Sequence, residues 1–593
     1  MQARLDTVPH WLQARAGQAP DQPAYWRRSM AGGWASVSWD EAISRVRALS
    51  AHLARLGLRP GDSVAMMMPT LPEWEYCQIA IQSIGGVVVG VDAHDAPENI
   101  RHILHTVRPR ALFLATHKQF EELKGLLPEA PVVVVALEPA RSTDILSLPE
   151  LLTHAADADP SWPTVEPDQT ATIIFTSGST GQPKGIAYSH RQLCQAGAAI
   201  LARFPGIRED ARLACWLPMS NLFQRIINLC AIMSGAQSYF VESPAEIIHR
   251  LPEIHPALFI GVPRFYEKLY AGIQAEVAKR PPPVRRAVRL AWAIGERFQK
   301  ARREGNDPGP LLGAAHALAE HLVLRRLRGM MGQNLKFMVS GSAPMPPWLL
   351  EKLHGLGWLV LEAYGISECV VPIAINSPDA YRFGSVGKPL PGNQIRLAED
   401  GELLVRGTGV FTGYCGAADI DSPLDAEAYL HTGDYARVDA DGYVWLTGRK
   451  SEIFKTSTGR RVAPTPVEAA LKQLAYVEHA VLFGRNRPVP VALLSLNTES
   501  LPDARTGEAP PPSLLEAIGR DVATACASLP ASQRPAGVLL TRRSFSISGG
   551  ELTSNLKLRR GGIEDKYSAD LDTLYLALAR STEHSHCLVL EIS

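Results

Sequence analysis

Apolar and polar positions follow two patterns along the first 140 residues: short β-branched runs and longer stretches with helical spacing. Ser38-Trp-Asp-Glu41 has the spacing of a capping box, which predicts a helix running toward Leu56. Short apolar runs between turn residues are typical of buried strands. The expected strands are 64–68, 87–91, 111–115 and 132–136, and the expected helices begin near 72 and cover 100–106. This alternation predicts α/β architecture with largely parallel sheets.

The rest of the chain shows one sharp boundary. Positions 138–167 have the composition of a surface connection, and 401–405 and 443–446 predict strands of a small β-rich region. After Gly448-Arg449 a compact helix and strand pattern begins again. We therefore expect a large N-terminal domain, 1–448, with mostly parallel sheets and a small β-rich subdomain, and a mobile α+β C-terminal domain, 449–593. In the latter we expect a helix over 464–474, strands over 480–484 and 491–496, a loop over 499–512, and no clear period after about 581.

Composition narrows the class of protein. A chain of 593 residues is too long for one core, so two or more domains are expected. The formal net charge is +0, so nothing global points to nucleic acid. None of the 8 cysteines forms a CxxC pair, which favours a reducing cytoplasm over a zinc site or a disulfide framework. The N-terminus has no apolar signal region, and no apolar stretch approaches the ~20 residues that cross a bilayer.

The segment Ile173-Ile-Phe-Thr-Ser-Gly-Ser-Thr-Gly-Gln-Pro-Lys-Gly185 carries the clearest chemistry. A β-branched strand enters a loop dense in glycine and hydroxyl side chains, and the loop ends in a lysine. Glycines allow several N–H groups to face one anion, and a lysine adds a charge that can reach terminal phosphates. These residues predict a phosphate-binding loop: Thr176, Ser177, Gly178, Ser179, Thr180, Gly181 and Lys184.

This loop is not a Walker-type P-loop. The spacing from Gly178 to Lys184 is wrong, Gly185 stands where Ser or Thr should follow, and no amphipathic helix begins at the lysine. A P-loop kinase or ATPase is therefore disfavoured. The loop instead resembles the signature loop of the adenylate-forming (AMP-binding) superfamily, which predicts further motifs in a fixed order.

Those motifs follow in that order. Tyr364-Gly-Ile-Ser-Glu368 resembles the family's aromatic-Gly-x-Thr-Glu segment, with Ser367 for Thr. The resemblance implies that Tyr364 stacks on adenine and that Glu368, with Thr176, coordinates Mg²⁺. An aromatic face suits a purine, and a carboxylate beside phosphates suits a hard cation. The residues Gly341, Ser342 and Ala343 resemble the adenine-side loop, and Gly365 lies in the same nucleotide-binding set.

The C-terminal third carries the remaining motifs. By resemblance, Asp434 accepts hydrogen bonds from the ribose hydroxyls and Arg449 helps to hold ribose and phosphate. The hinge is expected at 449–452, and Gly459 lies where CoA ligases hold the pantetheine arm. In Leu552-Thr-Ser-Asn-Leu-Lys557, the lysine matches the family's catalytic lysine. The expected catalytic set is thus Lys557, Lys184 and Glu368.

Several segments are most similar to long-chain fatty acyl-CoA synthetases, and the resemblance covers roughly residues 10 to 575. It implies an ATP-dependent acid–thiol ligase that uses ATP, Mg²⁺ and coenzyme A on a fatty acid of medium to long chain. One departure concerns the acyl substrate, because Asn221 and Gln224 stand where relatives have His and Glu. Two alternatives stay open: an acyl-AMP ligase serving a carrier protein or an amine, and a non-catalytic nucleotide- or acyl-binding protein.

The stretch 279–303 is strongly basic, with apolar residues at helical spacing. One interpretation is a helix that contacts an anionic membrane to collect fatty acid. The interpretation we favour from sequence is an amphipathic helix packed on its own domain with a solvated basic face. We therefore expect a cytoplasmic protein, with peripheral contact at the inner face of the membrane left open.

Overall fold

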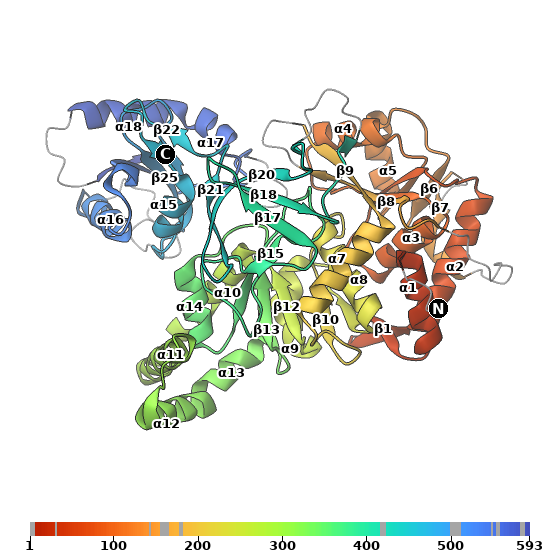
Figure 1. Cartoon of the computed structure of the whole chain (residues 1–593), viewed down its shortest axis with the longest axis horizontal. Helices are drawn as coiled ribbons and strands as arrows, with labels where there is room; N and C mark the ends of the chain where they lie inside the picture. The colour runs from red at the N-terminus through yellow and green to blue at the C-terminus, as the bar shows by residue number, and fades with distance from the viewer. Residues whose placement is uncertain are drawn as a thin grey trace. The chain divides into compact units, whose positions relative to one another are not determined.

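Two large mixed sheets covered by helices form the main body of the chain (Figure 1). The computed structural model describes residues 6–29, 32–140, 144–153, 165–176, 182–415, 423–497, 512–546, 549–552, 558–580 and 587–592. Within these residues no helix is long and apolar enough to cross a membrane. All eight cysteines lie in the described ranges and all are free thiols.

The first sheet has eight strands in the order β19-β9-β8-β4-β3-β5-β6-β7. Its central strands are parallel and buried on both faces, which explains their unbroken apolar runs. The strands are β3 (Ser63–Met67), β4 (Val87–Gly90), β5 (Ala111–Leu114), β6 (Val133–Ala136), β7 (Leu146–Ser147), β8 (Thr170–Thr176), β9 (Lys184–Ser189) and β19 (Tyr414–Cys415).

Helices α2 and α3 begin where the sequence signals predict, whereas α4 begins at Pro97, before the expected start at residue 100. Ser38 caps α2 in a complete capping box, in which the Glu41 N–H donates to Ser38 Oγ and the Ser38 N–H donates to Glu41 Oε2, both at 3.1 Å. The helices of this part are α2 (Trp39–Arg55), α3 (Pro72–Ser83), α4 (Pro97–Val107), α5 (His117–Leu123) and α6 (Leu148–Thr153).

The second sheet has nine strands in the order β16-β15-β14-β13-β12-β10-β11-β1-β2. From β1 through β11, β10, β12 and β13 to β14 each neighbouring pair is parallel, so these strands end at one edge. The strands are β1 (Pro23–Arg28), β2 (Trp34–Ser38), β10 (Arg212–Cys215), β11 (Gln237–Phe240), β12 (Leu258–Gly261), β13 (Phe337–Ser340), β14 (Val360–Tyr364), β15 (Ala374–Ile375) and β16 (Lys388–Pro389).

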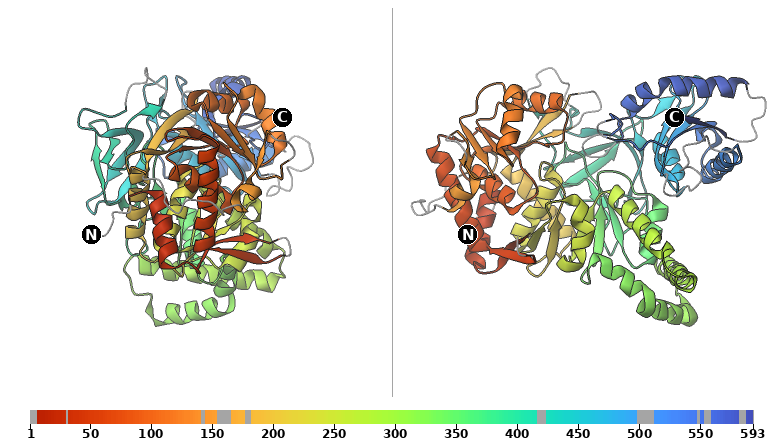
Figure 2. Two further views of the ribbon diagram at one scale, coloured as in Figure 1. Left: turned by 90° about the vertical axis from the view of Figure 1, so that its right-hand side faces the viewer. Right: turned by 180° about the vertical axis from the view of Figure 1, so that it is seen from behind.

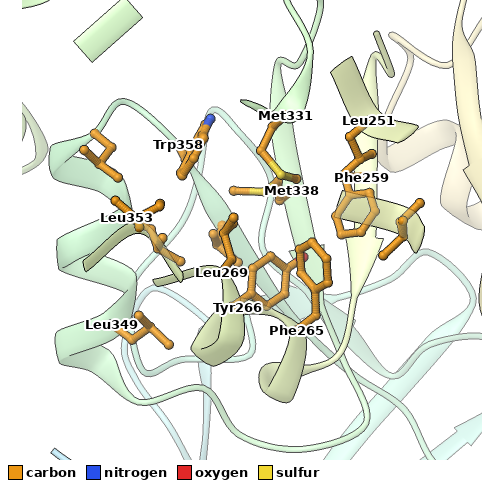
Figure 3. Close-up of a cluster of buried hydrophobic side chains, with 14 of the residues drawn as sticks. Leu251, Phe259, Phe265, Tyr266, Leu269, Met331, Met338, Leu349, Leu353 and Trp358 are labelled. Carbon is orange, nitrogen blue, oxygen red and sulfur yellow. The ribbon is translucent and has the colours of Figure 1, made fainter. Parts of the chain in front are cut away.

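A large aromatic and aliphatic core packs against this sheet (Figure 3). Phe259, Phe265 and Tyr266 meet at its centre, with ring centroids of Phe259 and Phe265 4.6 Å apart. The helices of this part are α1 (Val8–Gln18), α7 (His190–Arg203), α8 (Leu222–Ser234), α9 (Ile247–Ile254), α10 (Pro263–Ala278), α11 (Pro282–Arg303), α12 (Gly309–Ala319), the π-helical segment η3 (Glu320–Leu324), α13 (Arg325–Arg328) and α14 (Pro347–Gly355).

The basic stretch singled out in the sequence forms α11, which packs on α14 of its own domain. The Trp292 Nε1–H donates to the Lys352 carbonyl at 2.8 Å, and Glu296 pairs with the Lys352 ammonium at 2.9 Å. The apolar face of α11 is therefore buried and its basic face is exposed. Helix α12 follows as the second half of a helical hairpin, which projects from the sheets of this unit in both sets of views (Figure 1, Figure 2).

Smaller sheets complete the fold. One has the order β17-β18-β20-β21 and another the order β24-β25-β26-β27. The strands are β17 (Asn393–Leu397), β18 (Glu402–Gly407), β20 (Leu430–Val438), β21 (Val444–Arg449), β24 (Val477–Phe483), β25 (Val491–Leu496), β26 (Gly537–Thr541) and β27 (Leu588–Ile592), with a small ribbon of β22 (Phe454–Lys455) and β23 (Arg461–Val462). The helices beside them are α15 (Pro464–Leu471), α16 (Pro512–Ala525), α17 (Arg560–Lys566) and α18 (Ser568–Arg580).

The chain divides into two compact units. The first comprises residues 1–395, 405–430 and 440–444, and the second comprises 396–404, 431–439 and 445–593. The predicted α/β class, with mostly parallel sheets and an α+β C-terminal part, is confirmed. The predicted boundary at 448 and the mobility of the C-terminal domain stay predictions.

Two stretches hold more structure than the sequence pattern indicates. The stretch 138–167 contains β7 and α6, which are too short to show a period. Beyond 581, β27 pairs in parallel with β26, so a strand forms where no period was seen. The expected loop over 499–512 lies mostly outside the described residues, and α16 begins at Pro512.

The contact between α11 and α14 gives a stability prediction. A Cβ added at Gly295 would lie 2.1 Å from the Gly355 carbonyl oxygen, whereas one added at Gly313 in α12 would meet nothing within 4 Å. We expect Gly295→Ala to lower the free energy of unfolding by about 1–3 kcal/mol because the helices must separate. Gly313→Ala should leave it unchanged or raise it by up to ~1 kcal/mol. Thermal unfolding of both variants checks this, and equal midpoints would contradict it.

Candidate active site

The predicted phosphate loop connects two antiparallel strands. β8 ends at Thr176, β9 begins at Lys184, and these two residues face each other in the ladder. No helix starts at the lysine, in agreement with the exclusion of a Walker-type P-loop. Gly185 has little room for a side chain, since a Cβ there would lie 3.0 Å from Phe175 Cζ and 3.3 Å from Cys415 Cβ. The predicted loop residues Ser177, Gly178, Ser179, Thr180 and Gly181 lie outside the described residues.

The structure brings Lys184 and Glu368 to the same tyrosine. The Lys184 ammonium lies 4.9 Å from the ring centroid of Tyr414, and the Tyr414 hydroxyl donates to Glu368 Oε1 at 2.9 Å. A cation over a ring face and a hydroxyl on a carboxylate hold both charged side chains in place. Burial, and then the charge of Glu368, raise the pKa of Tyr414 above its ordinary value, so the hydroxyl keeps its proton and stays a donor.

The backbone of Glu368 is also fixed by a neighbouring segment. The Phe411 N–H donates to the Glu368 carbonyl at 2.9 Å, and Cys369 forms an isolated bridge with Val410. Sequence reasoning missed Tyr414, which lies on the short strand β19. Its partner there is β9, with Tyr414 opposite Ile186, so strand pairing and not sequence proximity places it beside Lys184.

The predicted nucleotide-binding loops follow parallel strands of the nine-stranded sheet. Gly341, Ser342 and Ala343 come directly after β13, and Tyr364 ends the neighbouring strand β14. The carboxyl ends of parallel strands are where open α/β sheets bind ligands. Ser342 adopts a left-handed backbone with φ of 73°. Ser342 and Ala343 are exposed, as are Gly365 and Ser367, whereas the Tyr364 side chain is largely buried.

A buried carboxylate that the sequence analysis missed supports these loops. Glu362 lies two residues before Tyr364 on β14 and is 5% exposed. Its two oxygens accept from the Gly384 N–H at 2.8 Å and from the Met345 N–H at 3.4 Å, directly after the adenine-side loop. Burial raises the pKa of Glu362 to about 8, against the lowering effect of the two N–H groups. Glu362 thus ties β14 to the loop after β13.

Asp434 and Arg449 pair with each other in the second unit. Asp434 Oδ1 lies 3.1 Å from Arg449 Nε, and Asp434 is 4% exposed whereas the arginine is half-exposed. The Asp434 N–H donates to Thr432 Oγ1 at 3.1 Å, and that hydroxyl donates to the Leu403 carbonyl at 2.7 Å. Asp434, predicted to bind ribose, is thus held through its backbone N–H and through the ion pair of its carboxylate with Arg449.

The predicted hinge residue Lys450 is held by two carboxylates. Its ammonium lies 2.8 Å from Asp400 Oδ2 and 2.8 Å from Glu402 Oε2. These hydrogen bonds raise the pKa of Lys450, so it stays charged. Glu402 also accepts from the Gly433 N–H at 2.9 Å and contacts His431 Nδ1 at 3.1 Å. Sequence analysis gave no role to Asp400 or Glu402.

Two predicted residues of the C-terminal part have different outcomes. Gly459 has φ of +80° in the turn between β22 and β23, and a Cβ there would meet nothing within 4 Å. The left-handed backbone at position 459 is by itself a reason for glycine there. The role of Gly459 beside coenzyme A stays a prediction. Lys557 lies outside the described residues. The residues flanking its segment, Leu552 and Leu558, form an antiparallel bridge.

The departure at Gln224 belongs to a buried polar network. Gln224 Oε1 accepts from the backbone N–H groups of Trp216 and Leu217, and its Nε2–H donates to Asn228 Oδ1 at 3.0 Å. Asn228 in turn donates to Glu75 Oε1 at 2.8 Å. Burial raises the pKa of Glu75 to about 7. Gln224 uses its amide donor here, which a carboxylate lacks. Asn221 is the residue that precedes α8.

The site residues fit a magnesium ion that is bound mainly by substrate phosphates better than a metal ion bound only by protein side chains. Among the described residues, no group of three or more His, Cys, Asp or Glu side chains gathers closely enough to hold a metal. Mg²⁺ typically binds through one or two carboxylates and substrate phosphates. A single carboxylate, Glu368, linked through Tyr414 to Lys184, matches that donor set.

Comparison with known proteins identifies the family. The AMP-binding enzyme model matches residues 12–415, and the AMP-binding enzyme C-terminal domain matches 452–579. The chain belongs to the AMP-binding enzyme family. The predicted membership of the AMP-binding superfamily is confirmed, and the motifs from Thr176 to Glu368 fall within the larger match.

Curated relatives extend the match along nearly the whole chain. The long-chain-fatty-acid–CoA ligase FadD15 of Mycobacterium bovis is 30% identical over 94% of this chain and 95% of its own length. The long-chain-fatty-acid–CoA ligase ACSBG1 of Mus musculus is 30% identical over 91% of this chain and 82% of its own length. The predicted resemblance to long-chain fatty acyl-CoA synthetases is thereby confirmed.

Solved structures of AMP-binding enzymes share the fold at low identity. The anthranilate CoA ligase AuaEII in complex with anthranoyl-AMP has a TM-score of 0.72 at 19% identity, covering 97% of this chain and 98% of that one. The A-PCP didomain of a carboxylic acid reductase from Segniliparus rugosus in complex with AMP has a TM-score of 0.75 at 19% identity, covering 98% and 83%. At these identities the likeness establishes the fold alone.

Tyr414 gives the first prediction from the site. Tyr414→Phe keeps the ring beneath Lys184 and removes the hydrogen bond to Glu368. Because hydrogen bonds to charged groups are stronger than neutral ones, we expect ATP–pyrophosphate exchange at limiting ATP to fall roughly tenfold. Tyr575→Phe, which removes a hydroxyl bonded to the Val489 carbonyl in the second unit, is the matched control. Equal exchange rates in both variants would contradict a role for Tyr414.

Glu362 gives a prediction on pH. Its pKa is raised from 4.5 to about 8, so the folded chain favours the protonated form. That contribution to stability is complete below pH ~4.5 and is lost as pH rises through about 8. Glu362→Gln removes this titration, so the thermal midpoint of the variant should gain on the wild type between pH 5 and 8. The exposed Glu399→Gln serves as control, and parallel pH profiles for all three proteins would refute the assignment.

Proposed function

We propose that this AMP-binding enzyme is an acyl-CoA synthetase, an ATP-dependent acid–thiol ligase for fatty acids of medium to long chain. It forms an acyl-AMP intermediate, transfers the acyl group to coenzyme A and releases AMP and pyrophosphate. The observation that carries this proposal is the match to long-chain-fatty-acid–CoA ligases along nearly the whole chain. The convergence of Lys184, Tyr414 and Glu368 at the end of β8 supports it.

In the first half-reaction a fatty carboxylate attacks the α-phosphate of ATP. Lys184 and the hydroxyl-rich loop after Thr176 hold the phosphates, and Tyr364 stacks on the adenine. Mg²⁺, held by Glu368 with Thr176, would supply a positive charge that offsets charge on the leaving pyrophosphate. Lys557 offsets charge where the mixed anhydride forms. These roles are positioning and electrostatics, which phosphoryl chemistry mainly requires.

In the second half-reaction the thiol of coenzyme A attacks the acyl carbonyl and AMP leaves. We propose that the C-terminal domain rotates about residues 449–452 between the two steps, withdrawing Lys557 and presenting Gly459. Asp434 and Arg449 hold the ribose throughout. The paired carboxylates on Lys450 give this segment a defined anchor, since both Asp400 and Glu402 reach its ammonium within 2.8 Å.

Two alternatives have weaker support. An acyl-AMP ligase that serves a carrier protein or an amine would share every adenylation residue, but the relatives at 30% identity carry CoA-ligase names. A non-catalytic binder would not need Lys184, Glu368, Asp434, Arg449 and Lys557 together. We also propose a peripheral contact with the inner face of the membrane, because fatty acids partition into bilayers.

Product analysis by mass spectrometry tests the proposal. The protein is incubated with ATP, Mg²⁺ and a panel of fatty and aryl acids, with and without coenzyme A. We expect acyl-CoA and AMP only when coenzyme A is present, with the strongest signal for a medium- or long-chain acid. Lys557→Ala should lose acyl-AMP formation and still convert supplied acyl-AMP to acyl-CoA, because only adenylation needs the lysine.

Other outcomes would redirect the assignment. Acyl-AMP that accumulates and ignores coenzyme A would favour the ligase for a carrier protein or an amine. Absence of ATP–pyrophosphate exchange with every acid would favour a binder. Equal loss of both half-reactions in Lys557→Ala would contradict the proposal that the lysine serves adenylation alone.

A further inference from the structure

Helix α12 is apolar and yet largely uncovered. Residues Gly309–Ala319 contain no Asp, Glu, Lys or Arg, and within the helix only Ala319 is buried. Leu311 is 87% exposed and Leu318 is 61% exposed. A helix that is apolar on all sides is normally buried in a core or in lipid. Exposed apolar side chains gathered on one element mark an interaction surface.

The exposed side chains follow one face of α12 and continue into the π-helical segment η3. Leu311, Ala314, Leu318 and Leu322 are all exposed, and their spacing of 3, 4 and 4 residues aligns them. We call these four residues the leucine stripe. Arg325 and Arg326 follow at the next turn and are exposed as well. The stripe is thus an apolar row that ends in two cations.

Packing of the opposite face fixes the stripe outward. His316 stacks on Phe298 of α11, with ring centroids 3.9 Å apart and an interplanar angle of 9°. Leu324 is fully buried in the core beneath the hairpin. Glu320 forms an ion pair with Arg328, which also donates to the Leu356 carbonyl at 3.0 Å. These contacts hold α12 on its own domain without covering the leucine stripe.

The charges around the stripe are mostly positive. Residues 279–328 contain twelve Lys and Arg against four Asp and Glu. On α11, Arg286, Arg289, Arg297 and Lys300 recur on the exposed face, and Leu290 beside them is 64% exposed. Within the described part of the chain, Arg286, Arg289 and Arg326 form no ion pair. Arg328 lowers the pKa of Glu320 through its hydrogen bond, and the charge of Arg325 helps to lower it further. The hairpin therefore combines exposed leucines with unpaired cations.

We propose that the α11–α12 hairpin docks on an anionic lipid bilayer, with the leucine stripe in the interface and the arginines at the headgroups. This inference rests on the proposed function. Docking would bring the enzyme to its substrate, because fatty acids are concentrated in lipid. Apolar residues on one face and basic residues around them are the pattern of helices that lie in the bilayer interface.

A second copy of the chain fits this surface less well. A two-fold interface would place the same basic patch against itself. Like charges would then face each other around the leucines, without the acidic residues needed to compensate. A bilayer that contains anionic lipid supplies both the apolar layer and the opposite charge.

Vesicle cosedimentation tests the docking independently of catalysis. The full chain is mixed with phosphatidylcholine vesicles, with and without phosphatidylglycerol. We expect binding that needs the anionic lipid and weakens with salt. A triple variant, Leu311→Ser, Leu318→Ser and Leu322→Ser, should bind roughly tenfold or more weakly. The control triple variant, Val132→Ser, Leu397→Ser and Leu576→Ser, changes similarly exposed residues elsewhere and should bind like wild type.

Two further readouts separate the possible failures. ATP–pyrophosphate exchange with a water-soluble medium-chain fatty acid should be the same in wild type and both triple variants. Stripe-dependent vesicle binding without exchange would retain the docking and reject the proposed enzyme activity. Binding that is absent in wild type, or equal in both triple variants, would overturn the docking. Dimerisation of the wild type that only the stripe variant abolishes would assign the surface to a second copy instead.

Discussion

The site depends on one constraint, the shared edge at which parallel strands end. Backbone hydrogen bonding occupies β13 and β14 along their lengths, so chemistry is available only where each strand stops. The loop Gly341–Ala343 and the segment from Tyr364 to Glu368 both begin at that edge. Glu362 on β14 then links the strand that leads to Tyr364 with the loop after β13, because it accepts from the Met345 N–H just beyond that loop. The order of the strands in the sheet therefore determines where the substrate-binding residues can lie.

Much of this arrangement could be predicted from the sequence because its parts are local. The capping box at Ser38, the apolar runs of β3 to β6 and the glycine- and hydroxyl-rich loop after Thr176 each show their role within a dozen residues. The family motifs add an order along the chain, which the matches over 12–415 and 452–579 confirm. The residue roles inside the site stay predictions, and Lys557 and most of the phosphate loop lie outside the described residues.

The residues that sequence reasoning missed act across long separations or inside buried strands. Tyr414 reaches Lys184 only because β19 adds to β9, and a two-residue strand leaves no periodic signal. Glu362 lies in a strand whose other residues are apolar or aromatic. The sequence around it does not indicate which N–H groups its carboxyl group accepts from. Lys450 has two acidic neighbours some fifty residues earlier, and no local rule connects them. The strand β27 is similarly visible only through its pairing with β26.

The pairing of β19 with β9 sets how this region can vary in length. Tyr414 faces Ile186 and Cys415 faces Gly185, where a side chain at position 185 would crowd Phe175 and Cys415. The connection from β16 to β19 contains β17 and β18, so added or lost residues leave that pairing intact only where they fall in the turns around these strands. A single residue inserted within β9 would instead shift the register and turn alternate side chains to the opposite face. Lys184 and Tyr414 would then part, although neither had been changed. Insertions and deletions between related chains should therefore avoid residues 184–189 and the predicted phosphate loop before them.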